Sequence, residues 1–198
     1  MARTGRRSSR VGIVSVTQYY TATTLDGFIA DPDNSLEWLF TRKREDDGPL
    51  SYGQFIAGVG AMAMGSTTYE WILDHEFAGQ DPSEWKWPYD FPCWVFTHRR
   101  LPVAPEARVE FTSGDVATVH REMVDAAGGR NVWIVGGGDL AGQFADAGLL
   151  DEVIVWIAPV TLGGGAPLLP RRIELRLDDL ARNGDFACAR FSVVGPTV

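Results

Sequence analysis

The chain has few of the residues from which disulfide frameworks and metal sites are built. Its 198 residues include two cysteines, Cys93 and Cys188, and three histidines that lie far apart in the sequence, His75, His98 and His120. Two cysteines are too few for a disulfide framework, and no Cys/His cluster has the spacing of a metal site. The sequence therefore predicts no metal ion and favours a reducing, cytoplasmic location.

Long apolar runs and several enzyme motifs are also missing. No apolar stretch approaches the roughly 20 residues that cross a membrane. The chain has no G-x-S-x-G turn and no P-loop lysine, so the usual hydrolases and kinases are disfavoured. We therefore expect a protein without a membrane segment, which offers a ligand groove rather than a nucleophile of its own.

Basic residues are scarce outside the first ten positions. Four of the 18 Lys and Arg residues lie there, and the 14 others face 26 Asp and Glu residues, so the rest of the chain has a net charge of −12. A surface of this sign repels nucleic acid. Residues 1–12 lack the apolar segment of a signal peptide, and we expect a disordered basic extension there. Residues 13–198 are expected to form one domain.

What the chain does contain is an apolar run that leads directly into three glycines. Residues 132–135 are apolar and rich in β-branched side chains, which is typical of a strand buried on both faces. Gly136, Gly137 and Gly138 follow, and apolar residues then recur at helical spacing. A glycine turn at a helix N-terminus presents bare backbone N–H groups and a positive helix end to a phosphate. The alternative is a tight turn that binds no ligand.

The same run fits the dinucleotide fingerprint G-x-G-x-x-A through Gly136, Gly138 and Ala141. A Rossmann domain also needs an acidic residue about 20 positions later, at the end of the next strand. The next expected strand, at residues 152–159, ends in Ala-Pro instead. The sequence therefore favours another nucleotide-binding α/β fold.

A second unit of strand, glycine and helix is expected at residues 61–70. An apolar strand ends at Gly65, and Thr67 with Glu70 predicts a capping box at the start of the helix that follows. Two such units in one domain favour a ligand with several phosphates, such as a dinucleotide.

The remaining elements complete an α/β domain. Asp115 is expected to cap a helix whose apolar face starts at Val116, with His120 on its solvent side. The aromatic-rich residues 74–92 are expected to be a loop fixed to its own domain or an oligomer contact, in preference to a lid. We further expect a short helix at 51–57, strands at 13–24, 94–97 and 108–111, and a C-terminal hairpin of 173–181 with 186–194.

Five motifs in order resemble the dihydrofolate reductase-like superfamily: TLDGFIA at residues 24–30, MGSTTYE at 64–70, VFTHR at 95–99, WIVGGG at 133–138 and APVTLGGG at 158–165. The branch they resemble most is the reductase domain of bacterial riboflavin biosynthesis, the RibD C-terminal type. The resemblance spans about residues 13–195. It implies a three-layer α/β fold with a mostly parallel central sheet, flanking helices and a C-terminal antiparallel hairpin, and it implies a homodimer.

The resemblance also implies that NADPH binds along the carboxyl edge of the sheet. The residues that match the cofactor motifs are Ile29, Ala30, Gly65, Ser66, Thr67, Thr68, Thr97, His98, Arg99, Gly136, Gly137, Gly138, Asp139 and Leu140. Position 66 is often an arginine that binds the 2′-phosphate in this superfamily, and here it is serine. Arg99 can take that part, so NADPH is favoured and NADH remains the alternative.

The same resemblance gives candidates for chemistry and substrate binding. Glu37 is the first candidate for the proton-donating carboxylate of this superfamily, and Asp33 is the second. Burial would raise the pKa of such a carboxylate, so that it could donate a proton. The alternative is that Glu37 is an exposed first-turn residue. Residues 72–96 contain no arginine, so the clamp that holds the glutamate of folate is missing. Substrate contacts are expected from Thr23, Asp26, Trp38 and Trp156.

Taken together, the motifs predict an NADPH-dependent reductase that transfers a hydride to a small heterocycle, of the pterin, flavin-precursor or aminopyrimidine ribitol type. Two alternatives stay open. The chain could bind a nucleotide without catalysis, or it could be a true dihydrofolate reductase.

Overall fold

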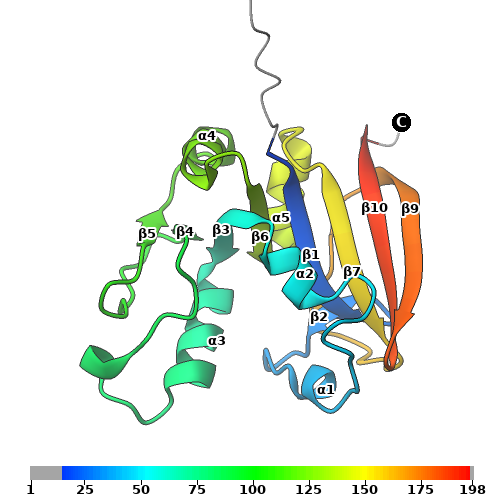
Figure 1. Cartoon of the computed structure of the whole chain (residues 1–198), viewed down its shortest axis with the longest axis horizontal. Coiled ribbons are helices and arrows are strands. Elements are labelled where there is room, and N and C mark those ends of the chain that lie inside the picture. The colour runs from blue at the N-terminus through cyan, green and yellow to red at the C-terminus, as the bar shows by residue number, and fades with distance from the viewer. Residues whose placement is uncertain (1–14, 197–198) are drawn as a thin grey trace, which may run out of the picture.

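A central eight-stranded sheet forms the framework of the protein (Figure 1). The structure is a computed structural model that describes residues 15–196. The strand order is β5-β4-β3-β6-β1-β7-β10-β9. The six strands from β5 to β7 are parallel, and β10 is antiparallel to both β7 and β9. Their bounds are β1 (Thr17–Thr24), β3 (Val59–Gly65), β4 (Cys93–Phe96), β5 (Val109–Thr112), β6 (Asn131–Gly136), β7 (Glu152–Ala158), β9 (Ile173–Asn183) and β10 (Phe186–Pro196).

Helices cover both faces of this sheet. Val119 of α4 (Val116–Ala127) and Phe144 of α5 (Gly138–Asp146) belong to one buried cluster, whereas Ile72 of α3 (Ser66–Phe77) belongs to another. Because both faces are covered, β3, β6 and β7 are nearly continuous apolar runs, whereas β1 also contains buried threonines and Gln18. The predicted three-layer fold with its C-terminal hairpin is confirmed. The shorter elements are α1 (Glu37–Phe40), α2 (Tyr52–Ile56), η1 (Pro82–Glu84) and a separate pair of strands, β2 (Phe28–Ala30) and β8 (Ala166–Pro167).

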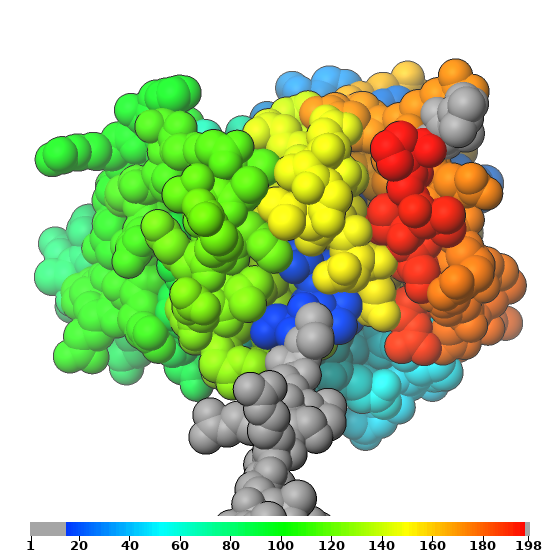
Figure 2. All heavy atoms as spheres, turned by 90° about the horizontal axis from the view of Figure 1, so that it is seen from above, coloured from blue at the N-terminus to red at the C-terminus, as the bar shows by residue number. Residues whose placement is uncertain are grey.

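The first strand lies in the middle of the molecule. Figure 2 shows its first residues, in blue, between green residues on one side and the yellow to red residues of the C-terminal part on the other. The hairpin β9–β10 forms one side of the molecule. Residues 13–14 of the predicted first strand and the predicted extension at 1–12 lie outside the described residues. Within residues 15–196, no helix has both the length and the apolar character needed to cross a membrane.

The cap predicted for α4 is confirmed, but the place predicted for His120 is wrong. The Asp115 carboxylate accepts a hydrogen bond from the Thr118 N–H at 3.1 Å. His120 is half-buried, with Nε2 2.7 Å from Oγ1 of Thr17 and its ring against Phe144. Burial lowers the pKa of His120. The helical pattern did not reveal that the start of β1 lies beside this part of α4.

The capping box predicted at Thr67 and Glu70 is also wrong. β3 runs directly into α3, so Gly65 is the N-cap and Thr67 already lies within the first turn. No side chain caps this helix, and the Glu70 carboxylate binds Arg99 instead.

The aromatic loop starts later than predicted, because α3 continues to Phe77. Trp85 stacks on Phe77 with ring centroids 5.1 Å apart, and Trp87 packs on Tyr69 at 5.5 Å. Tyr89 meets Trp133 edge-on at 5.9 Å. The loop is thus fixed to its own domain, which agrees with one of the two predicted alternatives. A contact of this loop with another copy stays a prediction.

Candidate functional site

The topology places two helix N-termini side by side at one edge of the sheet. β3 and β6 are neighbouring parallel strands, so Gly65 and Gly136 both lie at the carboxyl edge. α3 then packs on one face of the sheet and α5 on the other. Neighbouring strands whose helices leave to opposite faces open a crevice at this edge, which is where α/β folds bind ligands. A groove of about 590 Å³ lies there.

The groove brings together most of the residues predicted to bind the cofactor. It is lined by Ile29, Ala30, Gly65, Ser66, Thr67, Thr68, Gly136, Gly137, Gly138, Asp139 and Leu140. Thr97, His98 and Arg99 do not line it; they follow Phe96, a lining residue at the end of β4.

The two helices that face the groove lack side-chain caps. Their N-cap residues, Gly65 and Gly137, have extended backbone, and no side chain accepts a hydrogen bond from either first turn. α2 and α4, by contrast, are capped by Ser51 and Asp115. The free N–H groups of α3 and α5 and the positive ends of both helices therefore meet at one place, an arrangement suited to phosphate groups.

The glycines at this turn have different structural roles. A Cβ on Gly138 would overlap the carbonyl oxygens of Pro167 and Leu168, so the fold itself requires glycine there. A Cβ on Gly137 would have no heavy atom within 4 Å. Gly137 also lines the groove, so the space beside it is open to a ligand. The peptide bond between Gly136 and Gly137 is cis.

Arg171 bridges the first and last turns of α5, a role that no local motif indicated. Its guanidinium binds Asp139 at 2.9 Å and Asp146 at 2.7 Å, and it lies over Gly142, where a Cβ would collide with it. The pKa of Asp139 is lowered, first by a hydrogen bond from Gln143 and then by Arg171. Asp139 is the one acidic residue among the described lining residues, and the ion pair with Arg171 balances its charge.

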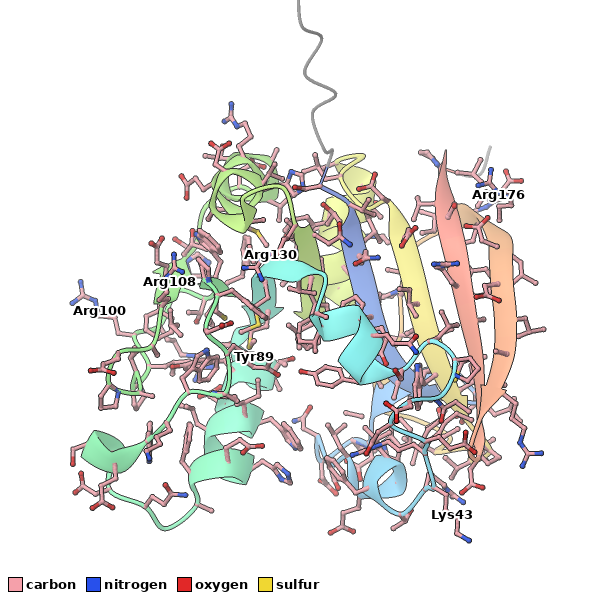
Figure 3. The ribbon with its side chains drawn as sticks, in the orientation of Figure 1. Lys43, Tyr89, Arg100, Arg108, Arg130 and Arg176 are labelled. Atoms are coloured by element: carbon pink, nitrogen blue, oxygen red, sulfur yellow. The ribbon has the colours of Figure 1, made fainter. Side chains whose placement is uncertain are left out.

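Aromatic and apolar side chains line another part of the groove. Trp71 and Tyr89 contribute rings, and Leu36 and Ile72 contribute apolar surface. The Trp71 ring lies nearly parallel to those of His75, at 4.6 Å, and Phe40, at 6.0 Å. Figure 3 shows Tyr89 between α3 and α2, and burial raises the pKa of its phenol. This surface is suited to a flat ring. The sequence interpretation did not assign Trp71 or Tyr89 to the site.

The four residues predicted to contact substrate do not line the groove. Asp26 accepts hydrogen bonds from Thr24 Oγ1 and from the N–H groups of Leu162 and Gly163, and these bonds, led by that of Thr24, lower its pKa. Its carboxylate thus ties two loops together. The other three are buried: Thr23 donates to the carbonyl of Phe28, Trp156 donates to that of Leu50, and Trp38 packs in the α3-side cluster.

The two predicted proton donors are exposed. Asp33 lies in the loop before α1, and Glu37 is the first residue of α1. Neither lines the groove, although Asn34 and Leu36, beside them in the chain, do. The exposure of Glu37 agrees with the alternative that it is a first-turn residue.

Comparison with known proteins identifies the family. Residues 16–183 match the RibD C-terminal domain. The chain belongs to the RibD C-terminal domain family. The chain is similar to the uncharacterized protein YwjB of Bacillus subtilis (strain 168). The two are 33% identical over 166 residues, which cover 81% of this chain and 88% of YwjB.

Solved structures show the same fold. A protein of Shewanella sp. PV-4 named for riboflavin biosynthesis matches with a TM-score of 0.73 and 23% identity over 90% of this chain and 98% of that one. Dihydrofolate reductase from Enterococcus faecalis, complexed with NADP(H), matches with a TM-score of 0.56 and 11% identity over 90% and 96%. The predicted resemblance to the RibD C-terminal type is confirmed by the family match, and the fold is shared with dihydrofolate reductase.

The two glycines should respond differently to alanine. Gly138→Ala is expected to lower the free energy of unfolding by about 3 kcal/mol, because the new methyl group overlaps backbone oxygens that cannot move independently. Gly137→Ala should cost less than about 1 kcal/mol, the scale of an altered N-cap. Urea unfolding of both variants measures the difference. Equal losses would show that the open space beside Gly137 is not present in solution.

Proposed function

We propose that this chain is an NADPH-dependent reductase that transfers a hydride to a small heterocycle of the pterin, flavin-precursor or aminopyrimidine ribitol type. The observation that carries the proposal is the pair of uncapped helices, α3 and α5, which begin at one groove beside the open space at Gly137. Membership of the RibD C-terminal domain family supports it. The homodimer and the cytoplasmic location stay predictions.

The groove fits a dinucleotide. Residues 136–140 would hold the pyrophosphate through backbone N–H groups, and the hydroxyls of Ser66, Thr67 and Thr68 would serve phosphate and ribose oxygens. Ile29 and Ala30 would border the nicotinamide, which supplies the hydride when the cofactor is bound. The chain's own contribution is to orient two rings against each other and to keep water from the space between them.

The residues that line the groove also indicate which kind of substrate it would accept. Trp71 and Tyr89 offer faces for a flat heterocycle. None of the described lining residues is Lys or Arg, so the groove has no bidentate partner for a substrate carboxylate. This composition favours a heterocycle without a glutamate tail over folate.

Cofactor binding is the first expected result. NADPH at one hundred times its Kd should stabilise the folded protein by about 2.7 kcal/mol, which thermal unfolding detects as a higher Tm. Gly137→Ala should fold and should lose this shift, because the methyl group fills the space proposed for the pyrophosphate. No shift of the parent with NADPH or NADH would refute the proposal, as would a folded Gly137→Ala protein that binds as tightly as the parent.

Glu37 remains the proposed proton donor, with Asp33 second, because the residues beside them line the groove. A general acid contributes roughly 10²- to 10⁴-fold to the rate. Glu37→Gln is therefore expected to lower kcat by at least about a hundredfold and to remove one limb of its pH profile. The matched variant is Glu76→Gln, an exposed carboxylate on α3. If both variants keep the parent's kcat, Glu37 is not the donor.

A further inference from the structure

An ion pair stands beside the α3 end of the groove. The guanidinium of Arg99 donates from both terminal nitrogens to the two carboxylate oxygens of Glu70, at 2.9 and 2.6 Å. Glu70 lies one turn beyond the lining residue Thr67 on α3, and Arg99 lies three positions after the lining residue Phe96. The hydrogen bonds from Arg99 to Glu70 raise the pKa of Arg99, so the guanidinium stays charged. The pair is bidentate and has no net charge.

The groove has no cationic side chain of its own among the described residues. The described lining residues include no Lys or Arg, and Arg171 is bound to Asp139 and Asp146. Arg100 is exposed and points away from the body of the molecule (Figure 3). Arg99 follows the lining residue Phe96 by three positions, so we take it to meet a charged group on the adenosine side of a bound dinucleotide. Its Nη1/Nη2 edge is already occupied by Glu70.

From this arrangement we infer that Glu70 sets the choice between NADPH and NADH by competing with the 2′-phosphate for Arg99. The inference rests on the proposed function. A 2′-phosphate that binds the guanidinium through the same edge must displace the carboxylate, and the freed carboxylate then repels the phosphate. NADH has an uncharged 2′-hydroxyl in place of the 2′-phosphate. It therefore neither has to displace the Glu70 carboxylate nor is repelled by it. The parent protein should therefore discriminate weakly between the two cofactors.

Serine at position 66 makes this competition decisive. The first turn of α3 offers hydroxyls and backbone N–H groups at residues 66–68, and these serve a ribose and a phosphate alike. They carry no full positive charge that would favour the 2′-phosphate. Selectivity for NADPH then depends on whether the guanidinium of Arg99 is available to the 2′-phosphate, and its ion pair with Glu70 determines this.

The test compares Kd values for NADPH and NADH, measured by titration at one ionic strength, for the parent, Glu70→Gln, Arg99→Ala and the double variant. Glu70→Gln is expected to tighten NADPH roughly tenfold, the combined scale of an exposed ion pair and one like-charge repulsion. NADH should change by less than about twofold. Arg99→Ala should remove the gain in the double variant, so the two substitutions should not be additive.

Asp74→Asn is the matched control, because it removes the same charge from an exposed position further along α3. It should leave the ratio of the two Kd values unchanged. A looser NADPH complex in Glu70→Gln would overturn the inference, since Glu70 would then orient Arg99 for the phosphate. An unchanged ratio in Glu70→Gln would overturn it too. If the parent and all variants bind neither cofactor, the proposed function falls and this inference with it.

Discussion

Two neighbouring parallel strands, β3 and β6, end at the same edge of the sheet and send their helices to opposite faces. This constraint positions the rest of the site. Each helix begins directly from a glycine, so its first N–H groups face the crevice without a side-chain cap. Because these donors are backbone groups on buried strands and helices, their place is set by the packing of the whole domain.

The walls of the groove are held by contacts that span the chain. Asp26 ties the turn after β1 to residues 162–163, and Arg171 ties the segment after β8 to α5. Glycine at position 138 lets that segment pass against the start of α5. The hydrogen bonds that Asp26 accepts from Leu162 and Gly163 therefore give it a structural role, although its side chain is exposed.

Local patterns were enough to predict individual strands, both glycine turns, the α4 cap and the C-terminal hairpin, because each of these is encoded by neighbouring residues. The mostly parallel arrangement of the strands came from the motif resemblance. Partner choice across the chain was not predictable in this way. Glu70 has the spacing of a capping box, yet Arg99, 29 positions away, binds it. Thr17 and His120 meet across 103 positions, and Arg171 reaches Asp139 across 32. The motif resemblance located the groove but not the aromatic side chains of Trp71 and Tyr89, because no spacing rule brings them to it.

The central claim is that the first turns of α3 and α5 form one dinucleotide site. Backbone amide NMR of the labelled protein during titration with NADP⁺ tests it most directly. The account predicts saturable chemical-shift changes centred on the N–H groups of residues 66–68 and 137–140, at both helix N-termini together. Changes at only one of the two helices would contradict it. Changes centred on the separate hollow lined by residues 42–46, Arg182, Gly184 and Asp185 would contradict it too.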